Sequence, residues 1–344
     1  MNETNEQDPS NFRQTVLESP GQFEAGMDLA AGTKFPDHPG LRSLMISGMG
    51  GSALPGNLFR VYLNDLSARG LLSERLSIYQ NRFYDLPWEA RRALNVFASY
   101  SGNTEETIES FESAVAEKLP SLGISSGGKV EEICAREDLP HIKLPIPFPN
   151  FQPRSGTGYF FGALFQVLVN EGIAPDMKAE IAAGAEYLRT RLAELEERGK
   201  AVAKRCIGKT PVIYAGARYK PVAMVWKIKM NENAKTTAFW NFFPELNHNE
   251  MVGYTLPQGS FHVIMLRDPE DHPKNLKRFE ITAELLRKQG TSVEILDMEG
   301  ENVFNRMFDS ILLADFASYA LALENGVDPT PVDMVEDLKK QLVK

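Results

Sequence analysis

The chain has 344 residues, of which 43% are hydrophobic and 24% are charged, and its formal net charge is −9. This length suffices for two domains of ordinary size, and the composition is that of a soluble globular protein. The negative charge argues against nucleic acid and anionic membranes as main partners, because both attract basic proteins. No apolar run is long enough to span a bilayer, and the first eight residues are acidic and polar, unlike a secretory signal.

The chain contains two cysteines, Cys134 and Cys206, which lie far apart in the sequence. They imply no disulfide framework, and a reducing cytoplasm is therefore the expected compartment. Histidines and cysteines do not cluster at the spacing of metal ligands. The sequence thus gives no reason to expect a metal or another cofactor.

The first elements are an amphipathic helical stretch from about Asn11 to Leu29, broken at Pro20-Gly21, and a buried strand at 44–47. The strand leads directly into the glycine-rich turn 48–53, GMGGSA. Such a turn between a strand and a helix favours anions, because the helix N-terminus presents unpaired N–H groups. A dinucleotide motif would require glycine at Ala53 and an acidic residue about twenty residues later, so we expect no nicotinamide cofactor.

Four more strands are expected in the first half, mostly separated by helical segments, at 76–79, 94–98, 121–125 and 141–144. Strands that alternate with helices predict a parallel sheet covered on both faces. Ligands of such sheets bind beyond the carboxyl ends of the strands. The turn at 48–53 follows one strand in this way, and a second polar turn follows the strand at 94–98.

This second turn is 99–107, SYSGNTEET, between the strand at 94–98 and a helical pattern. Three hydroxyl residues, Ser99, Ser101 and Thr104, surround Gly102, which lets the backbone approach a ligand closely. We interpret the turn as a phosphate cradle. The structural alternative is a capped helix, with Asn103 as N-cap and an acidic residue three positions later. Two anion-binding turns in one domain favour the cradle over the cap.

The proline-rich segment 144–153 is interpreted as a linker, and the expected domains are residues 1–152 and 153–344. It leads to Arg154, just ahead of an apolar helix at 159–169. An arginine here is either a surface residue or a group that closes over an anion bound at the neighbouring turns. The planar guanidinium suits a phosphate or a developing oxyanion.

The second half repeats the strand–glycine–helix order, with a long charged helix at 178–204, a strand at 211–215 and a helix at 222–235. This copy lacks the glycine pair and the serine, so we do not expect it to bind phosphate. The remaining expected elements are strands at 260–266 and 292–296, helices at 279–288 and 308–323, and a C-terminal helix that opens at Thr330-Pro331-Val332-Asp333.

Two polar segments of the second half call for an explanation: 231–235, NENAK, and the loop 244–251, PELNHNEM. Structural explanations are an ion pair between Glu232 and Lys235, and a hydrogen-bonded loop histidine at His248. A carboxylate and a histidine close to a phosphate cradle are also the groups that move a proton between neighbouring carbons.

Six segments, in chain order and nearly end to end, resemble the bifunctional phosphoglucose/phosphomannose isomerases: GMGGSA, SYSGNTEET, PRSGTG, NENAK, PELNHNEMVG and DPTPVDMVEDLK. SGNTEET occurs across the wider sugar-isomerase superfamily, whereas NENAK and NHNE with a downstream lysine are typical of catalytic members. One departure is Asn95-Val96-Phe97, which is less β-branched than a central strand of such a sheet. The resemblance implies an α/β fold of two sugar-isomerase domains, each a parallel β-sheet flanked by helices. It also implies a homodimer with active sites in clefts between domains and subunits.

The resemblance assigns substrate binding to six residues: Gly51, Ser52, Ser99, Ser101, Thr104 and Arg154. It implies that Glu232 is the catalytic base and His248 the ring-opening residue, and that Lys339, rather than the adjacent Lys340, is the catalytic lysine. The implied reaction interconverts glucose 6-phosphate and mannose 6-phosphate with fructose 6-phosphate through a cis-enediolate, without metal or redox cofactor. Two alternatives stay open. One is a non-catalytic sugar-phosphate-binding regulator, which would not need the three catalytic residues, and the other is an isomerase of another sugar phosphate, such as an amino sugar or pentose phosphate.

Overall fold

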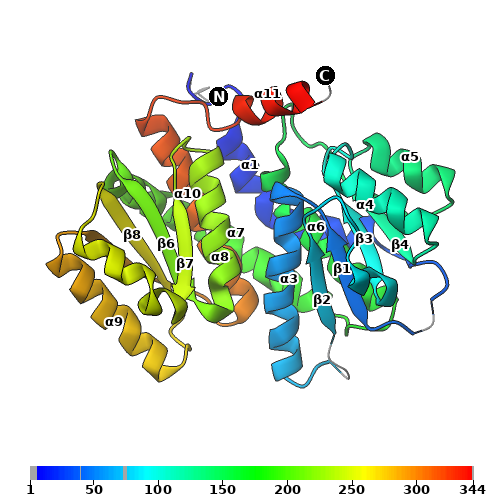
Figure 1. Ribbon diagram of the computed structural model, residues 1–344, viewed down its shortest axis with the longest axis horizontal. Coiled ribbons are helices and arrows are strands. Elements are labelled where there is room, and N and C mark those ends of the chain that lie inside the picture. Colours follow the sequence, from blue (N-terminus) through cyan, green and yellow to red (C-terminus); the bar gives the residue numbers. More distant parts are fainter. Residues whose placement is uncertain (1–5, 39, 73–75, 343–344) are drawn as a thin grey trace. The chain divides into compact units, whose positions relative to one another are not determined.

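The computed structural model describes residues 6–38, 40–72 and 76–342, so most of the acidic start of the chain lies outside the described residues. The chain forms two compact units, each with its own sheet (Figure 1). We call Glu18–Arg189 the N-terminal unit, and Met1–Leu17 together with Thr190–Lys344 the C-terminal unit. The long helix α7 (Lys178–Cys206) contributes to both units.

The N-terminal unit contains a parallel five-stranded sheet of order β2-β1-β3-β4-β5. Its strands are β1 (Ser43–Ser47), β2 (Ser77–Asn81), β3 (Leu94–Ala98), β4 (Ser121–Ser125) and β5 (His141–Lys143). Every residue of β3 and β4 is buried, as expected for central strands covered on both faces. Polar Asn95 is accommodated within β3 because its side-chain amide donates to the carbonyls of Ala90 and Ala93 at 3.0 and 2.9 Å.

The helices of this unit are α2 (Gln22–Leu29), α3 (Gly50–Ala68), α4 (Glu105–Ala116), α5 (Gly128–Arg136) and α6 (Thr157–Asn170), with short turns η1 (Ser19–Gly21), η2 (Trp88–Arg92) and η3 (Pro153–Ser155). Helix α6 packs on α2 through glycine: a Cβ at Gly162 would lie 2.1 Å from the carbonyl oxygen of Phe23. This close contact keeps α6 in the N-terminal unit. The boundary between the two compact units therefore lies between residues 189 and 190. The domain boundary expected from the sequence lies between residues 152 and 153.

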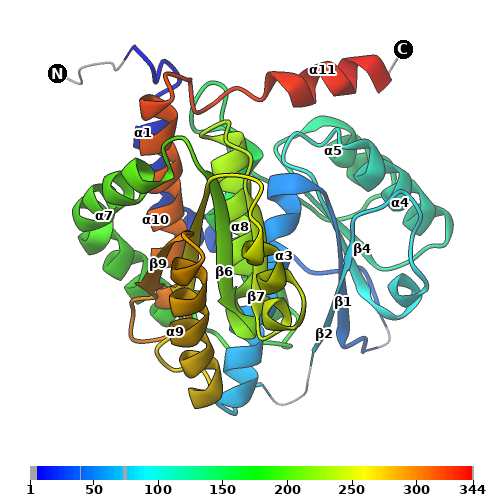
Figure 2. The ribbon, with the colours of Figure 1, turned by 60° about the vertical axis from the view of Figure 1, so that its left-hand side comes forward.

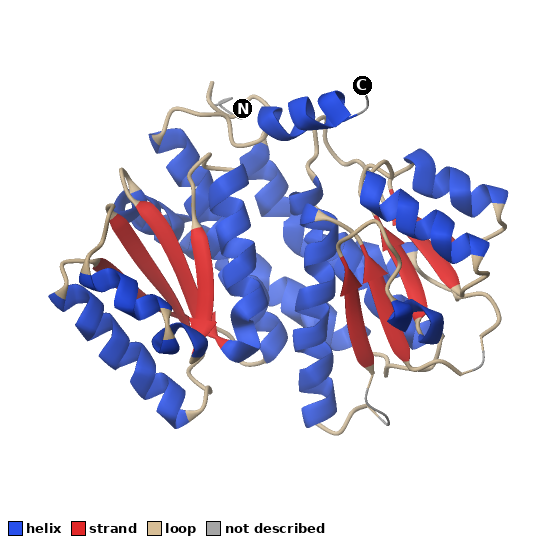
Figure 3. Cartoon of the chain, viewed as in Figure 1, coloured by secondary structure: helices blue, strands red, loops and turns tan. Residues whose placement is uncertain are grey.

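The C-terminal unit holds a parallel four-stranded sheet of order β7-β6-β8-β9. Its strands are β6 (Thr210–Gly216), β7 (Phe239–Phe243), β8 (Phe261–Arg267) and β9 (Ser292–Asp297), and its helices are α1 (Phe12–Glu18), α8 (Lys220–Glu232), α9 (Pro273–Lys288), α10 (Val303–Glu324) and α11 (Asp333–Leu342). Short turns occur at η4 (Ala217–Tyr219), η5 (Glu245–His248) and η6 (Glu250–Thr255). The two sheets appear as separate groups of red arrows in Figure 3.

Two sequence expectations for this unit were wrong in detail. No strand was expected directly before the loop 244–251, where β7 (Phe239–Phe243) lies; it is an edge strand whose mixed exposure and aromatic composition conceal it. Helix α8 ends at Glu232, and Lys235 has a left-handed φ of 53°, so the helix does not extend to 235. The expectation of parallel sheets flanked by helices is confirmed. None of the helices in the described ranges combines the length and the apolar character needed to cross a membrane.

Candidate active site

The two turns predicted to bind an anion, 48–53 and 99–107, meet at the point where the strand order of the N-terminal sheet reverses. Strands β1 and β3 are neighbours there, with Ser47 paired to Phe97 at their carboxyl ends. A Cβ added at Gly48 would lie 2.6 Å from the carbonyl oxygen of Ala98, so glycine is required for the turns to lie side by side. In open parallel sheets this switch point is where ligands bind.

The first turn connects β1 to α3 and joins the second turn directly. The Ser52 hydroxyl accepts a hydrogen bond from the backbone N–H of Tyr100 at 2.9 Å. Gly51 lies against another predicted residue, since a Cβ there would be 2.5 Å from the backbone nitrogen of Arg154. No side chain caps the N-terminus of α3 at Met49, so the first-turn N–H groups and the helix dipole favour an anion.

The second turn is held by its own hydroxyls. The Ser99 and Thr104 hydroxyl oxygens are 2.8 Å apart, and the backbone N–H of Thr104 donates to Ser99 Oγ at 3.4 Å. Ser101 is exposed, and its hydroxyl accepts from the backbone N–H of Asn103 at 3.3 Å. Gly102 has φ +74°, and a Cβ there would meet the carbonyl oxygen of Gly127 at 1.7 Å. Only glycine fits this position.

The capped-helix alternative for this turn is wrong in its residue assignment. Helix α4 has Thr104, not Asn103, at its N-cap, and no side-chain hydrogen bond caps it. Instead, the Asn103 carbonyl oxygen Oδ1 accepts from the backbone N–H of Lys129 at 3.1 Å, and its Nδ2 donates to the Ser101 carbonyl at 3.2 Å. Asn103 therefore fixes the shape of the turn against α5.

A third turn, after β4, supports the cradle and was missed by the sequence reasoning. The Ser126 hydroxyl donates to the carbonyl of Tyr100 at 2.7 Å, and the Ser126 backbone N–H donates to the same oxygen at 2.8 Å. Gly127 and Gly128 make the close contacts with the second turn. The available signal was the sequence Ser-Ser-Gly-Gly at 125–128, placed directly after a buried strand.

Arg154 is buried rather than on the surface, with 1% of its area exposed. It lies in η3, where one guanidinium nitrogen donates to Gln152 Oε1 at 3.4 Å. The backbone of Arg154 borders Gly51, so this charge lies at the same edge of the sheet as the two turns. The N-terminal unit thus brings all six predicted substrate-binding residues to one end of its sheet.

Glu232 is the last residue of α8, and its neighbours hold this helix end in place. Asn231 Oδ1 accepts from the backbone N–H of Ala238 at 2.8 Å, and buried Asn233 donates to Ser318 Oγ at 2.9 Å. Lys235 Nζ donates to the backbone carbonyl of Glu232 at 2.6 Å and to that of Pro329 at 3.2 Å. The NENAK segment therefore forms a fixed support for the Glu232 side chain, and it also anchors the chain just before α11.

His248 ends the short turn η5 and is exposed, while the residues beside it are anchored. Asn247 Nδ2 donates to Thr282 Oγ1 at 2.9 Å, and the Tyr214 hydroxyl donates to Glu250 Oε1 at 2.5 Å. Burial raises the pKa of Tyr214, so this phenol stays neutral and acts as a donor. Within the described part of the chain no side chain or backbone group hydrogen-bonds to the His248 ring. The loop-histidine explanation therefore does not hold here.

The C-terminal unit does not bring Glu232 and His248 together. Helix α8 follows β6 and packs along the sheet (Figure 2). Because α8 returns from the carboxyl end of β6, its last residue, Glu232, lies at the amino-terminal edge of the strands. Strand β7 is parallel to β6 and leads back to the carboxyl edge, where η5 packs against its end. Glu232 and His248 of one chain consequently occupy opposite edges of the same sheet.

Lys339 lies on α11, a helix on which no residue is buried. Its Nζ pairs with Glu336 at 2.7 Å, and Lys340 pairs with Asp337 at 3.3 Å, each one turn back on the same helix. These equivalent contacts do not distinguish the two lysines.

Neither the cysteines nor a cluster of metal ligands adds a second reactive centre among the described residues. Cys134 and Cys206 are free and buried, and burial raises the pKa of each thiol to about 12, so neither is a nucleophile near neutral pH. Among the residues that the structure describes, no three or more His, Cys, Asp or Glu side chains group so that they could hold a metal ion.

Comparison with solved structures shows the fold. The C-terminal domain of glucosamine-fructose-6-phosphate aminotransferase from Francisella tularensis matches with a TM-score of 0.68 and 14% identity, covering 93% of this chain and 97% of that one. Tagatose-6-phosphate ketose/aldose isomerase from Escherichia coli matches with a TM-score of 0.64 and 14% identity, covering 93% and 94% of the two chains.

The sequence similarity to known proteins extends over nearly the whole chain. Residues 195–342 match the model of the bacterial phospho-glucose isomerase C-terminal SIS domain. A bifunctional phosphoglucose/phosphomannose isomerase from Caldicellulosiruptor bescii is 33% identical, covering 94% of this chain and 95% of that protein. A second, from Aquifex aeolicus, is 32% identical over 88% and 91% of the two chains. A D-glucosamine-6-phosphate 4-epimerase from Sulfolobus acidocaldarius is 29% identical over 89% and 92%. With relatives of this identity and coverage, the chain belongs to the bifunctional phosphoglucose/phosphomannose isomerase family.

Proposed function

We propose that the protein interconverts glucose 6-phosphate and mannose 6-phosphate with fructose 6-phosphate. The observation that carries this proposal is the meeting of two anion-binding turns and buried Arg154 at the β1/β3 switch point, in a chain of this isomerase family. All three sugars share a 6-phosphate, and one cradle of N–H groups and hydroxyls can hold it in each case.

The substrate-binding residues take different roles in this proposal. Ser99, Ser101 and Thr104, with the first turn of α4, bind the phosphate, and Gly51 and Ser52 form the opposite wall. The guanidinium of Arg154 stabilises the negative charge that develops on the sugar oxygens, because a preorganised cation acts most strongly in a site shielded from water.

Glu232 is proposed as the proton carrier between C1 and C2. Its carboxylate removes the proton from C2 of the open-chain aldose, giving a cis-enediolate, and then returns a proton to C1. The C1 oxygen gains a proton and the C2 hydroxyl loses one, so the aldehyde becomes an alcohol and a ketone forms at C2. Carboxylates of this kind contribute about 10²–10⁴-fold to the rate. Protonation of the enediolate on either face of C2 gives glucose or mannose 6-phosphate.

His248 and Lys339 are proposed to open the sugar ring, by moving a proton between the ring oxygen and the C1 hydroxyl. Because Glu232 and His248 lie at opposite edges of one sheet, the same chain does not place both beside one substrate through this unit alone. A homodimer in which His248 serves the partner's site accounts for both residues. The segment around His248 supports this, since half-buried Phe242 and exposed Val252 are apolar residues suited to an interface.

A second candidate is chemistry on an amino-sugar phosphate, and it is favoured by the similarity to the D-glucosamine-6-phosphate 4-epimerase. A non-catalytic regulator is the third, although it would not need Glu232, His248 and Lys339. We place the protein in the cytoplasm, because both thiols are free and buried and no oxidising compartment is needed.

The test is proton NMR in D₂O with glucose 6-phosphate, mannose 6-phosphate and glucosamine 6-phosphate offered separately. We expect fructose 6-phosphate to form from the first two, with deuterium entering at C2 of the remaining aldose. Binding without exchange would indicate a regulator. Turnover of glucosamine 6-phosphate alone would favour the second candidate.

A further inference from the structure

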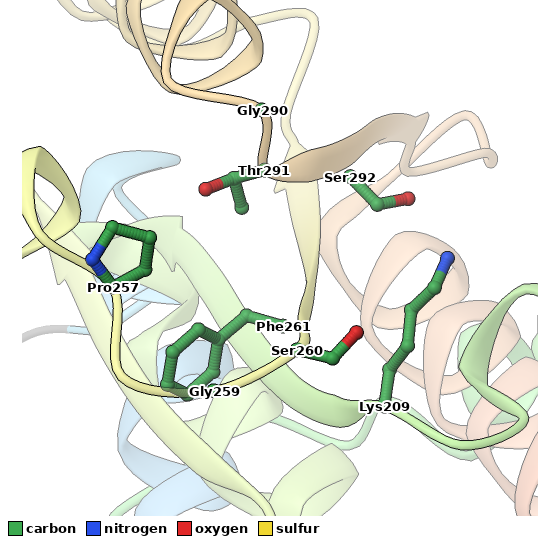
Figure 4. A pocket seen from close by; sticks show the side chains of 8 residues that line it. All are labelled: Lys209, Pro257, Gly259, Ser260, Phe261, Gly290, Thr291 and Ser292. Atoms are coloured by element: carbon green, nitrogen blue, oxygen red, sulfur yellow. The ribbon is translucent and has the colours of Figure 1, made fainter.

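A pocket of about 400 Å³ lies at the amino-terminal edge of β6, β8 and β9 in the C-terminal unit. Its walls come from the α7–β6 turn with Lys209, the segment before β8 with Ser260, and the α9–β9 turn with Thr291 and Ser292 (Figure 4). None of these residues belongs to the segments that carry the proposed catalytic or substrate-binding groups. The volume is in the range of small-molecule sites.

The lining of the pocket carries one positive charge, Lys209, in a chain whose net charge is −9. Lys209 is half-buried in its wall, and the lining contains no carboxylate. Over the described ranges no acidic side chain forms an ion pair with the Lys209 ammonium, whereas nearby Arg205 pairs with Glu294 at 3.3 Å. A half-buried cation without a protein counter-charge attracts an anion from solution.

Hydroxyl groups complete the polar side of the pocket. Figure 4 shows the Ser292 hydroxyl and the Lys209 ammonium pointing toward one another, with the Ser260 hydroxyl turned to the same side. The oxygens of a phosphate accept from ammonium and hydroxyl donors alike. Donors from two turns and from the first residue of β9 therefore face one space.

Ser292 is connected to a buried histidine that controls which way its hydroxyl donates. His262, 1% exposed, has Nδ1 2.8 Å from Ser292 Oγ and Nε2 2.7 Å from Glu294 Oε1. When the imidazole is neutral, its single proton faces the Glu294 carboxylate, so Nδ1 accepts the Ser292 proton. When the imidazole is protonated, Nδ1 donates to Ser292 Oγ, and the hydroxyl is released to donate into the pocket.

The nearest carboxylate is held by groups other than Lys209. Glu294 on β9 contacts His262 Nε2 at 2.7 Å and pairs with Arg205, at the end of α7, at 3.3 Å. The Glu294 carboxylate is therefore engaged by His262 and Arg205 rather than by the ammonium in the pocket.

We propose that this pocket is a second anion site, separate from the substrate cradle, which binds a small oxyanion of the phosphate-monoester class. It does not rest on the proposed isomerase activity, because none of its residues is a proposed catalytic or substrate-binding group. Its ligand class comprises free phosphate and phosphorylated metabolites, which share the dianionic group.

Equilibrium dialysis with radiolabelled inorganic phosphate tests the site. We expect two phosphates per wild-type chain, one at the cradle and one at the pocket. Lys209→Ala should bind one, with at least about 10-fold weaker affinity at the pocket, because it loses a charged donor. Lys209→Arg should retain the second phosphate, and so should the control Lys274→Ala, which removes an exposed lysine in the first turn of α9. One phosphate per wild-type chain, unchanged in Lys209→Ala, would overturn the proposal.

The variant Ser101→Ala/Thr104→Val removes two hydroxyl groups of the cradle, so that phosphate binding at the pocket can be measured alone. It should bind one phosphate. Ser292→Ala on this background should weaken that binding, because the pocket loses a hydroxyl donor. Unchanged phosphate affinity in Ser292→Ala would refute the role of this hydroxyl. If the cradle variant instead binds two phosphates, the cradle assignment fails and the pocket assignment stands.

Discussion

Glu232 and His248 lie at opposite edges of one parallel sheet, because α8 carries the first to the amino-terminal edge and β7 leads to the second at the carboxyl edge. Two groups that act on the same sugar cannot be supplied by one copy of this unit in this arrangement. The relationship makes subunit complementation the most informative test of the proposed dimer.

We predict that a mixture of the inactive variants Glu232→Gln and His248→Ala regains activity after subunit exchange. Half of the randomly formed dimers are heterodimers with one of two sites intact, so activity should reach about a quarter of wild type. Steady-state kinetics before and after exchange, with native mass spectrometry to count heterodimers, makes the measurement. Heterodimers without activity would show that both residues serve one chain's site.

Glu232→Gln alone should lower kcat by about 10²–10⁴-fold for both hexose phosphates, because the amide cannot accept the carbon-bound proton. Its affinity for a non-reactive sugar phosphate should stay near wild type, since the phosphate contacts lie elsewhere. Glu324→Gln, at the end of α10, serves as a control for the charge change. Near-normal turnover in Glu232→Gln would remove this residue from the mechanism.

Ser101→Ala and Thr104→Val should raise KM more than they lower kcat, because the phosphate is remote from the reacting carbons. Some loss of kcat is expected, since phosphate binding also positions the sugar. Ser113→Ala is the matched control: this exposed hydroxyl on α4 donates only to the carbonyl of Glu109, at 3.0 Å. If the variant with both substitutions bound a phosphorylated inhibitor as tightly as wild type, the turn 99–107 would have only a structural role.

Gly51→Ala should destabilise the fold by about 1–3 kcal/mol and weaken substrate binding, because the new Cβ would lie 2.5 Å from the Arg154 backbone nitrogen. The neighbouring Gly50→Ala is a comparison without a clash, since nothing lies within 4 Å of its Cβ position; its φ of +49° costs about 1–2 kcal/mol. Thermal unfolding and KM should separate the variants. We expect only Gly51→Ala to change KM markedly, and equal KM values would argue against Arg154 as a substrate contact.

Lys339→Ala should reduce kcat for cyclic substrates, while Lys340→Ala should leave it near wild type. Each lysine pairs with an acid on its own exposed helix, so the two variants lose similar surface ion pairs, worth about 0–1 kcal/mol, and differ only in position. Pre-steady-state measurement of ring opening makes the comparison specific. The opposite ranking would move the catalytic assignment to Lys340.

Most of the regular elements were predictable from the sequence, because the signals that define them are local. Buried strands such as 94–98 are short apolar runs, and glycine-rich turns mark their carboxyl ends. The strand–turn–helix order alone predicted parallel sheets with two anion-binding turns at one edge. Even the position of Gly102 was informative, since a left-handed φ next to hydroxyl residues is a property of the local backbone.

What the tertiary structure decided depends on contacts between residues far apart in the chain. Arg154 is buried and its backbone borders Gly51, which lies about a hundred residues earlier in the chain, and α6 joins the N-terminal unit because glycines let it contact α2. Strand β7 was missed because an edge strand is recognised by its partner β6 rather than by its own pattern. The placement of Glu232 and His248 at opposite edges follows from the direction in which α8 and β7 cross the sheet, and side-chain periodicity carries no information about that direction.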